Sequence, residues 1–219
     1  MLTCVGKLKI MSEQVQAAQT IIEQLAGIIP GSAVAKNYQR RAVAREQAEL
    51  SYQLLLYPQT PGPVSLDERR VIAAFVAGLY KEPATQSHYR ALLQSVSPVW
   101  EHELAQILQK IDSNGPWGSY PSGPLSAEDV SGEIWKHTPE QERIFGSRLV
   151  AALEHAHLLA THPRDANATA LGHLASAGWD EDGIVVLSQL ISFLSFQVRI
   201  VAGFAALVAQ SSSRTTESV

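Results

Sequence analysis

The sequence has a single cysteine, Cys4, among its 219 residues. One thiol cannot form an internal disulfide, and it excludes both a Cys-x-x-Cys redox pair and a zinc site built from several cysteines. We therefore expect a reducing, cytoplasmic setting. Cys4 also precedes Met11, so a chain translated from Met11 would have no cysteine at all.

The sequence also lacks a surplus of positive charge. Its 17 Lys and Arg residues face 21 Asp and Glu residues, which gives a net charge of -4. Nothing in this balance would neutralise phosphate groups, so we expect neither a nucleic acid nor an anionic membrane surface as partner.

A long, uninterrupted apolar run is missing as well. The most apolar segment, residues 184–208, is interrupted by six polar or charged side chains: Ser188, Gln189, Ser192, Ser195, Gln197 and Arg199. A membrane span needs about 20 consecutive apolar residues, so a buried helix of a soluble protein is the better interpretation. No segment longer than four residues alternates like a strand, and the sequence predicts an all-α protein.

Helical periodicity and Gly/Pro-rich breaks divide the chain. We predict helices at 12–26, 32–56, 66–80, 83–93, 98–110, 138–160, 167–177 and 180–210. In the helix at 32–56 the core face is expected to hold Ala33, Tyr38, Val43, Ala44, Leu50 and Leu54, with the charged residues on the other side, and Thr138 with Gln141 forms a capping box that begins the helix at 138–160. The predicted parts are an N-terminal extension with the first helix (1–30), a first helical repeat (31–111), a Gly/Pro-rich linker (112–137), a second repeat (138–210) and a mobile tail (211–219). A weak internal similarity aligns residues 66–80 with 179–193.

The stretch 64–93 carries the clearest local signals. Ser65 and Glu68 form a capping box that begins a helix ending near Tyr80. Its apolar stripe is Ile72, Phe75, Val76 and Leu79. Pro83 fits only the first turn of a helix, so Glu82 and Pro83 indicate the N-cap and first residue of a second helix. The two helices are thus expected to meet at a tight corner.

This stretch resembles the core helix pair of the carboxymuconolactone decarboxylase and alkylhydroperoxidase D-like family. The family's usual form is an S-x-x-E-R-E helix, then Asn-Gly-Cys-x-x-Cys, then a histidine one turn on. In the alignment Arg70 replaces the relay glutamate, Glu82 the first cysteine and Thr85 or Ala84 the second, while His88 matches the relay histidine. The resemblance implies two helical repeats over about residues 30–210 and a homo-oligomer. With both sulfurs absent, we expect no thiol peroxidase activity.

Four residues are candidates for a site that needs no cofactor. His88 could act as a general acid or base, or could be a hydrogen-bonded histidine between helices. Glu82 could be a base if it is desolvated, or simply a helix cap. Arg199, with the apolar neighbours Val198 and Ile200, could bind a substrate carboxylate or form an ion pair between repeats or subunits. The resemblance adds Thr85 as a substrate-binding residue.

A cluster of potential ligands lies at Glu154, His155, His157 and His162. On a helix the side chains of 154, 155 and 157 point in divergent directions, and no H-x-x-x-H pair with a third ligand is present. We expect a solvated or interfacial face here and no metal site. The four tryptophans (Trp100, Trp117, Trp135 and Trp179) are expected to be packing anchors rather than a ligand cage.

Three hypotheses for function remain open. The first is acid–base chemistry on a small acid or lactone in a pocket near His88, as the decarboxylase branch of the family implies. The second is a catalytically silent scaffold or small-molecule binding protein. The third is a partner of a separate, cysteine-bearing homologue in a mixed oligomer.

Overall fold

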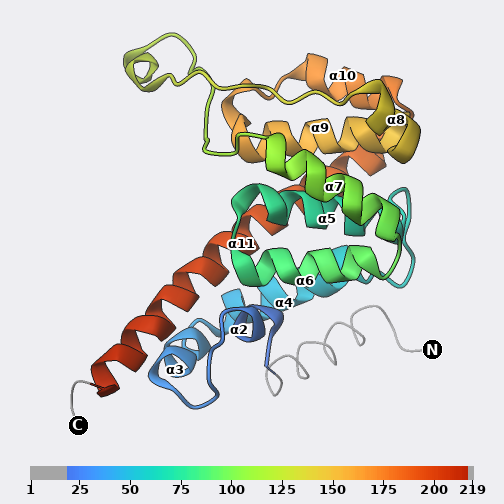
Figure 1. Ribbon diagram of the computed structural model, residues 1–219. Coiled ribbons are helices and arrows are strands. Elements are labelled where there is room, and N and C mark those ends of the chain that lie inside the picture. The colour runs from blue at the N-terminus through green and yellow to red at the C-terminus, as the bar shows by residue number, and fades with distance from the viewer. Residues whose placement is uncertain (1–18, 217–219) are drawn as a thin grey trace. The chain divides into compact units, whose positions relative to one another are not determined.

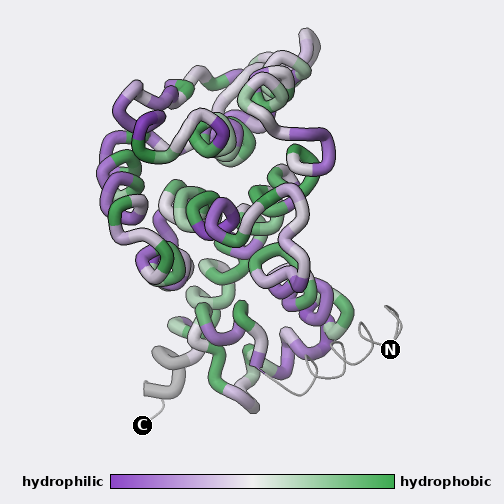
Figure 2. The backbone as a smooth tube through the Cα atoms, turned by 90° about the vertical axis from the view of Figure 1, so that its right-hand side faces the viewer, coloured by the Kyte–Doolittle hydropathy of each residue, from purple (hydrophilic) through white to green (hydrophobic). Residues whose placement is uncertain are grey.

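The protein is all-α, as predicted. The computed structural model describes residues 19–216, and the elements of regular secondary structure in this part of the chain are all helices. An isolated bridge between Gly118 and Val130 is the one β feature among the described residues. Hydrophobic and hydrophilic residues alternate around most helices (Figure 2), which is the pattern of amphipathic helices.

The chain folds into two compact units. Among the described residues, one comprises 19–59 and 196–216, and the other 60–195. Helix α11 (Glu181–Thr216) contributes to both. The segment 112–137 lies inside the second unit, so the compact units do not divide where the sequence placed the linker.

The first unit contains α2 (Ile21–Leu25), α3 (Ala33–Gln39) and α4 (Ala42–Leu56). Residues 12–18 of the predicted first helix lie outside the described residues. The predicted helix at 32–56 is two helices, because the backbone leaves helical geometry at Arg41 (φ -99°, ψ 50°). The ring of Tyr38, at the end of α3, packs on that of Phe204 of α11 with centroids 4.7 Å apart.

The buried face of α4 differs from the predicted one. Val43, expected in the core, is 74% exposed. Arg45 and Glu49, expected on the solvent side, are buried. Arg45 donates from Nε and Nη2 to the two carboxylate oxygens of Glu23 (3.0 and 2.8 Å), and Glu49 accepts the backbone N–H of Ile21 at 2.8 Å. A buried charge is tolerated when it is paired and hydrogen-bonded, and these bonds join α2 to α4.

The second unit is built around α5 (Leu66–Tyr80). This helix packs against α6 (Pro83–Gln94), α7 (Pro98–Lys110) and α9 (Ser147–Thr161), and α9 also contacts α8 (Pro139–Phe145) and α10 (Ala168–Ser176) (Figure 1). Two short 3₁₀ helices, η1 (Pro124–Glu128) and η2 (Pro163–Asp165), lie in the connections. The predicted helix at 138–160 is divided at Gly146, whose φ of 82° is left-handed.

Helix α5 is buried on nearly all sides. The capping box is confirmed, since Ser65 Oγ accepts the Glu68 N–H and the Glu68 carboxylate accepts the Ser65 N–H. Its predicted stripe, Ile72, Phe75, Val76 and Leu79, is buried. So are Val71, Ala73, Ala74 and Ala77 on its other faces. Small alanines on these faces let neighbouring helices approach closely, which makes α5 the core of this unit.

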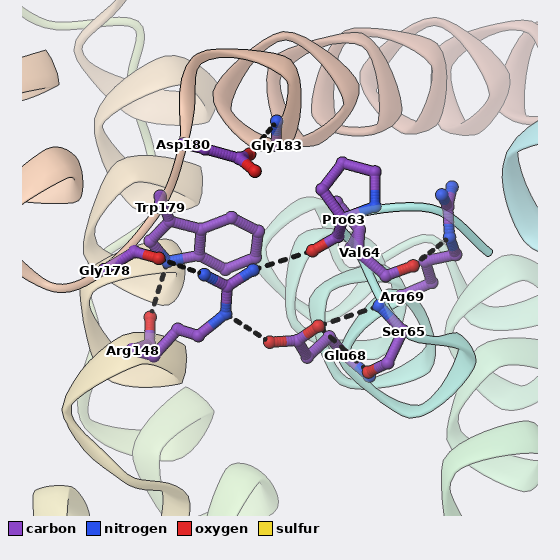
Figure 3. Close-up of polar contacts among 10 residues, drawn as sticks. All are labelled: Pro63, Val64, Ser65, Glu68, Arg69, Arg148, Gly178, Trp179, Asp180 and Gly183. Carbon is purple, nitrogen blue, oxygen red and sulfur yellow. Dashed lines mark hydrogen bonds and ion pairs between the residues drawn. The ribbon is translucent and has the colours of Figure 1, made fainter.

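Arg148 joins three segments that are distant in the sequence (Figure 3). Its Nε donates to Glu68 Oε1 at 2.9 Å, Nη2 donates to the carbonyl of Pro63 at 2.7 Å, and Nη1 donates to the carbonyl of Gly178. The guanidinium also lies over the ring of Trp179, 3.7 Å from its centroid. The indole N–H of Trp179 donates back to the Arg148 carbonyl at 2.9 Å. The start of α5 is thereby fixed to the start of α9 and to the α10–α11 turn.

The stretch Glu181–Ser211 of α11 is long and apolar enough to cross a membrane by length and composition, which the sequence analysis did not expect. Its most apolar window is 39% buried inside the protein. Leu187, Leu190 and Leu194 are fully buried. A core helix of a soluble protein passes the same test, so the finding is compatible with a soluble protein.

We predict that Arg148→Met lowers the free energy of unfolding by about 2 kcal/mol, because it removes charge-assisted hydrogen bonds and the stacking on Trp179. Urea denaturation monitored by circular dichroism measures the change. Arg143→Met is the matched control: its ion pair with Glu140 is exposed, so its effect should be within about 0.5 kcal/mol. Equal effects of the two substitutions would contradict this role of Arg148.

Candidate functional site

Helices α5 and α6 meet at the predicted corner, which we call the elbow (residues 80–83). Helix α5 ends at Tyr80, and Lys81 takes a left-handed conformation with φ 55°. Glu82 is the N-cap of α6 and Pro83 its first residue. A lysine in this conformation is uncommon. The left-handed turn at Lys81 changes the direction of the chain between α5 and α6.

Glu82 acts as a helix cap, the structural role that the sequence analysis had weighed against catalysis. Its carboxylate accepts the N–H groups of Ala84 (3.2 Å) and Thr85 (2.7 Å). The hydroxyl of Thr85 donates to the same carboxylate, and the Thr85 side chain is fully buried. The first turn of α6 thus holds a carboxylate and a hydroxyl that are bonded to each other.

His88 is half-buried on α6. Burial lowers the pKa of its imidazole, which favours the neutral form at neutral pH. Its ring meets the edge of the Tyr89 ring, with centroids 4.9 Å apart. His88 lines neither of the two cavities described below.

Arg199 is exposed on the part of α11 that belongs to the first unit, and it lines neither cavity. Val198 and Val201 are buried, but successive helical residues are turned by about 100°, which carries Arg199 to the outer face.

A cavity of about 190 Å³ lies beside the elbow, between α5, α6 and α7. We call it the elbow cavity. Its apolar wall is formed by Ala74, Gly78, Leu93, Leu104, Ala105 and Leu108. A Cβ at Gly78 would lie 2.2 Å from Leu108 Cδ1, so this glycine allows α7 to approach α5.

The polar lining of the elbow cavity carries more positive than negative charge. It comprises Lys81, Gln86, Arg90, Glu101 and Gln109. Arg90 donates through Nε to Glu101 Oε1, and its terminal nitrogens have no partner among the described residues. The side chains of Lys81, Gln86 and Gln109 likewise make no hydrogen bond within the described part of the chain. Four polar side chains therefore have donors available to a ligand.

Helical geometry explains why His88 is remote from this cavity. Gln86, Arg90 and Leu93 are spaced i, i+4 and i+7, so they share the face of α6 that meets the cavity. His88 follows Gln86 by two residues and is turned by about 200° from it, to the opposite side of α6. Lys81 and Arg90 were not among the candidates predicted from the sequence. The spacing of Arg90 and Leu93 along α6 was a signal for Arg90, whereas Lys81 precedes α6 and shares no such spacing.

The chain matches no protein-family model, and no curated protein matches it.

The three histidines of α9 and its C-cap are buried, so the solvated alternative of the predicted solvated or interfacial face is wrong. His155, His157 and His162 are at most 5% exposed. Burial lowers the pKa of His155 to about 4, and burial together with neighbouring His162 lowers that of His157 to about 4. His162 is held between Asp165 Oδ2 (3.1 Å) and the carbonyl of Glu133 (3.0 Å). Among the described residues, no group of three or more His, Cys, Asp or Glu side chains could hold a metal ion.

We predict that the protein loses stability as the pH falls from about 6.5 to 4. The unfolded histidines bind protons near pH 6.5, whereas folded His155 and His157 resist protonation until about pH 4. The contribution of the two neutral histidines to the free energy of unfolding is complete above pH 6.5. It declines by roughly 3 kcal/mol for each histidine as the pH falls to 4. Urea unfolding at several pH values measures the slope.

The double variant His155→Gln, His157→Gln should flatten this slope, whereas His102→Gln, at an exposed position on α7, should retain it. A double variant whose slope equals that of the wild type would contradict the assignment.

Proposed function

We propose that the protein binds a small organic acid in the elbow cavity. The observation that carries the proposal is the terminal guanidinium of Arg90, whose nitrogens have no partner among the described residues while Nε is fixed by Glu101. The two terminal nitrogens of a guanidinium match the two oxygens of a carboxylate. Lys81 borders the same cavity and adds a second positive charge.

The lining of the elbow cavity also favours a ligand that has an apolar part beside its acid group. Leu93 and Leu104 are buried at the cavity wall and offer an apolar surface to a hydrocarbon ring or chain. A volume of about 190 Å³ suits a small acid rather than a nucleotide-sized ligand. Lys81 and Arg90 each carry a positive charge and Glu101 carries a negative one, so the lining of the cavity has a net charge of one positive unit.

Binding without turnover is favoured over catalysis at this site. Glu82 is engaged as a cap, and His88 lies on the opposite side of α6 from the cavity. Acid–base chemistry on a lactone at His88 is the second candidate. The lowered pKa of His88 favours it, since a neutral imidazole can accept a proton at neutral pH.

The relationship to the carboxymuconolactone decarboxylase and alkylhydroperoxidase D-like family is part of this proposal, as is a cytoplasmic location. The capping box at Ser65, the elbow and His88 one turn into α6 support the relationship. The exposed Phe196 and Leu207 on α11 support the proposal of a homo-oligomer.

We predict that benzoate binds in the elbow cavity and that Arg90→Gln weakens its binding at least tenfold, because a charge-assisted, two-point contact is lost. Isothermal titration calorimetry with benzoate measures the affinity. Benzamide, which has the same shape but no charge, should bind more weakly than benzoate to the wild type.

Lys81→Gln should also weaken benzoate binding, while Arg143→Gln, at an exposed position on α8, should not. The proposal fails if both cavity variants bind benzoate as tightly as the wild type, or if benzamide binds as tightly as benzoate.

We also predict that the protein does not turn over hydrogen peroxide with an added dithiol reductant, because Glu82 and either Thr85 or Ala84 align with the family's cysteines and none of the three has a thiol. A peroxide-consumption assay on the wild type and on Cys4→Ser measures this. Robust turnover by Cys4→Ser would overturn the exclusion of sulfur chemistry.

A further inference from the structure

A second and larger cavity, of about 410 Å³, lies in the second unit between residues 134–136, α9 and α10. We call it the α9–α10 cavity. It shares no lining residue with the elbow cavity. Trp135, Leu158 and Ala170 supply apolar surface, and His155 is among its polar lining residues. Its volume falls in the range of small-molecule sites in proteins.

His155 has a hydrogen-bonding atom that the protein leaves unused. The side chain is 5% exposed, and Nε2 lies 3.1 Å from Ser188 Oγ. Nδ1 is buried and has no hydrogen-bond partner among the described residues. A buried polar atom without a partner costs about 1–3 kcal/mol, so a ligand that pairs with it gains affinity. The lowered pKa keeps this imidazole neutral at neutral pH, with one donor and one acceptor nitrogen.

The charged groups of this cavity are already paired with the protein. Lys136 Nζ lies 2.7 Å from Glu154 Oε2, and Glu154 Oε1 accepts the backbone N–H of His137 at 3.1 Å. Asp165 accepts the N–H of Ser119 at 3.1 Å and faces His162 Nδ1. The one lysine of the lining is thus paired with a carboxylate, in contrast to Lys81 of the elbow cavity.

We propose that the α9–α10 cavity is a second ligand site, for an uncharged aromatic molecule with a single hydroxyl or carbonyl group. The ring of the ligand packs against Trp135, and its polar group pairs with Nδ1 of His155. Aromatic packing provides most of the contact, and the one hydrogen bond orients the molecule. The site is independent of the proposed acid site.

The test uses p-cresol, with toluene as the matched ligand that lacks the hydroxyl. Binding is followed in the full chain by the NMR signal of the Trp135 indole N–H, assigned with Trp135→Phe. We expect p-cresol to shift this signal and to bind roughly fivefold to tenfold more tightly than toluene, the value of one neutral hydrogen bond.

Two substitutions of His155 by amides of similar shape test the roles of its two ring nitrogens one at a time. Asn places a polar atom near the position of Nδ1, and Gln places one near Nε2. His155→Asn should therefore retain the preference for p-cresol over toluene, whereas His155→Gln should abolish it and leave toluene binding unchanged. His102→Gln serves as the control and should behave as the wild type.

Three results would overturn the proposal: no shift of the Trp135 signal with p-cresol, an undiminished preference in His155→Gln, or tighter binding of benzoate than of p-cresol at this signal. A failure of benzoate to bind at the elbow cavity would leave this test unaffected, because the two cavities have no residue in common.

Discussion

The contacts of one arginine fix the framework on which both cavities depend. Arg148 binds the capping residue Glu68 at the start of α5, the carbonyl of Gly178 in the α10–α11 turn, and the ring of Trp179. Helix α5 forms part of the wall of the elbow cavity, and α9, on which Arg148 lies, forms part of the wall of the α9–α10 cavity. A single planar cation with several directional bonds thus adds to the direct packing of α5 on α9 in holding these two helices together.

The elbow is a rigid structural corner with its own internal hydrogen bonds. Glu82 satisfies the first free N–H groups of α6, and Thr85 donates to the same carboxylate. A group engaged in this way is poorly placed for proton transfer, since it would have to leave the helix terminus that stabilises its charge. The donors that have no partner among the described residues line the elbow cavity instead, on Lys81 of the elbow and on Arg90 of α6.

Local signals in the sequence predicted most helix boundaries. The capping box at Ser65, the N1 proline at Pro83 and the capping box at Thr138 each act within one turn, and each is found where it was predicted. The partner of Glu68 could not be predicted in this way, because Arg148 is 80 residues away in the chain. Helix existence is a local property, whereas the pairing of charges across helices is set by tertiary packing.

The errors share a physical cause. Hydrophobicity alone assigned Val43 to the core and the charges of α4 to the surface, but the ion pair of Arg45 with Glu23 is fully satisfied and therefore tolerated inside. Likewise the histidines of α9 were assigned to a solvated or interfacial face, although a neutral imidazole can be buried at moderate cost. For the candidate site, the sequence located the elbow but not the face of α6 that lines a cavity. That choice depends on where α7 packs, which Gly78 and Leu108 determine.

The most direct test of the account is a crystal structure of the protein with bound benzoate. The account predicts the benzoate carboxylate on the terminal nitrogens of Arg90, with the ring against Leu93 and Leu104. A carboxylate bound at His88 or in the α9–α10 cavity, with the elbow cavity empty, would contradict it.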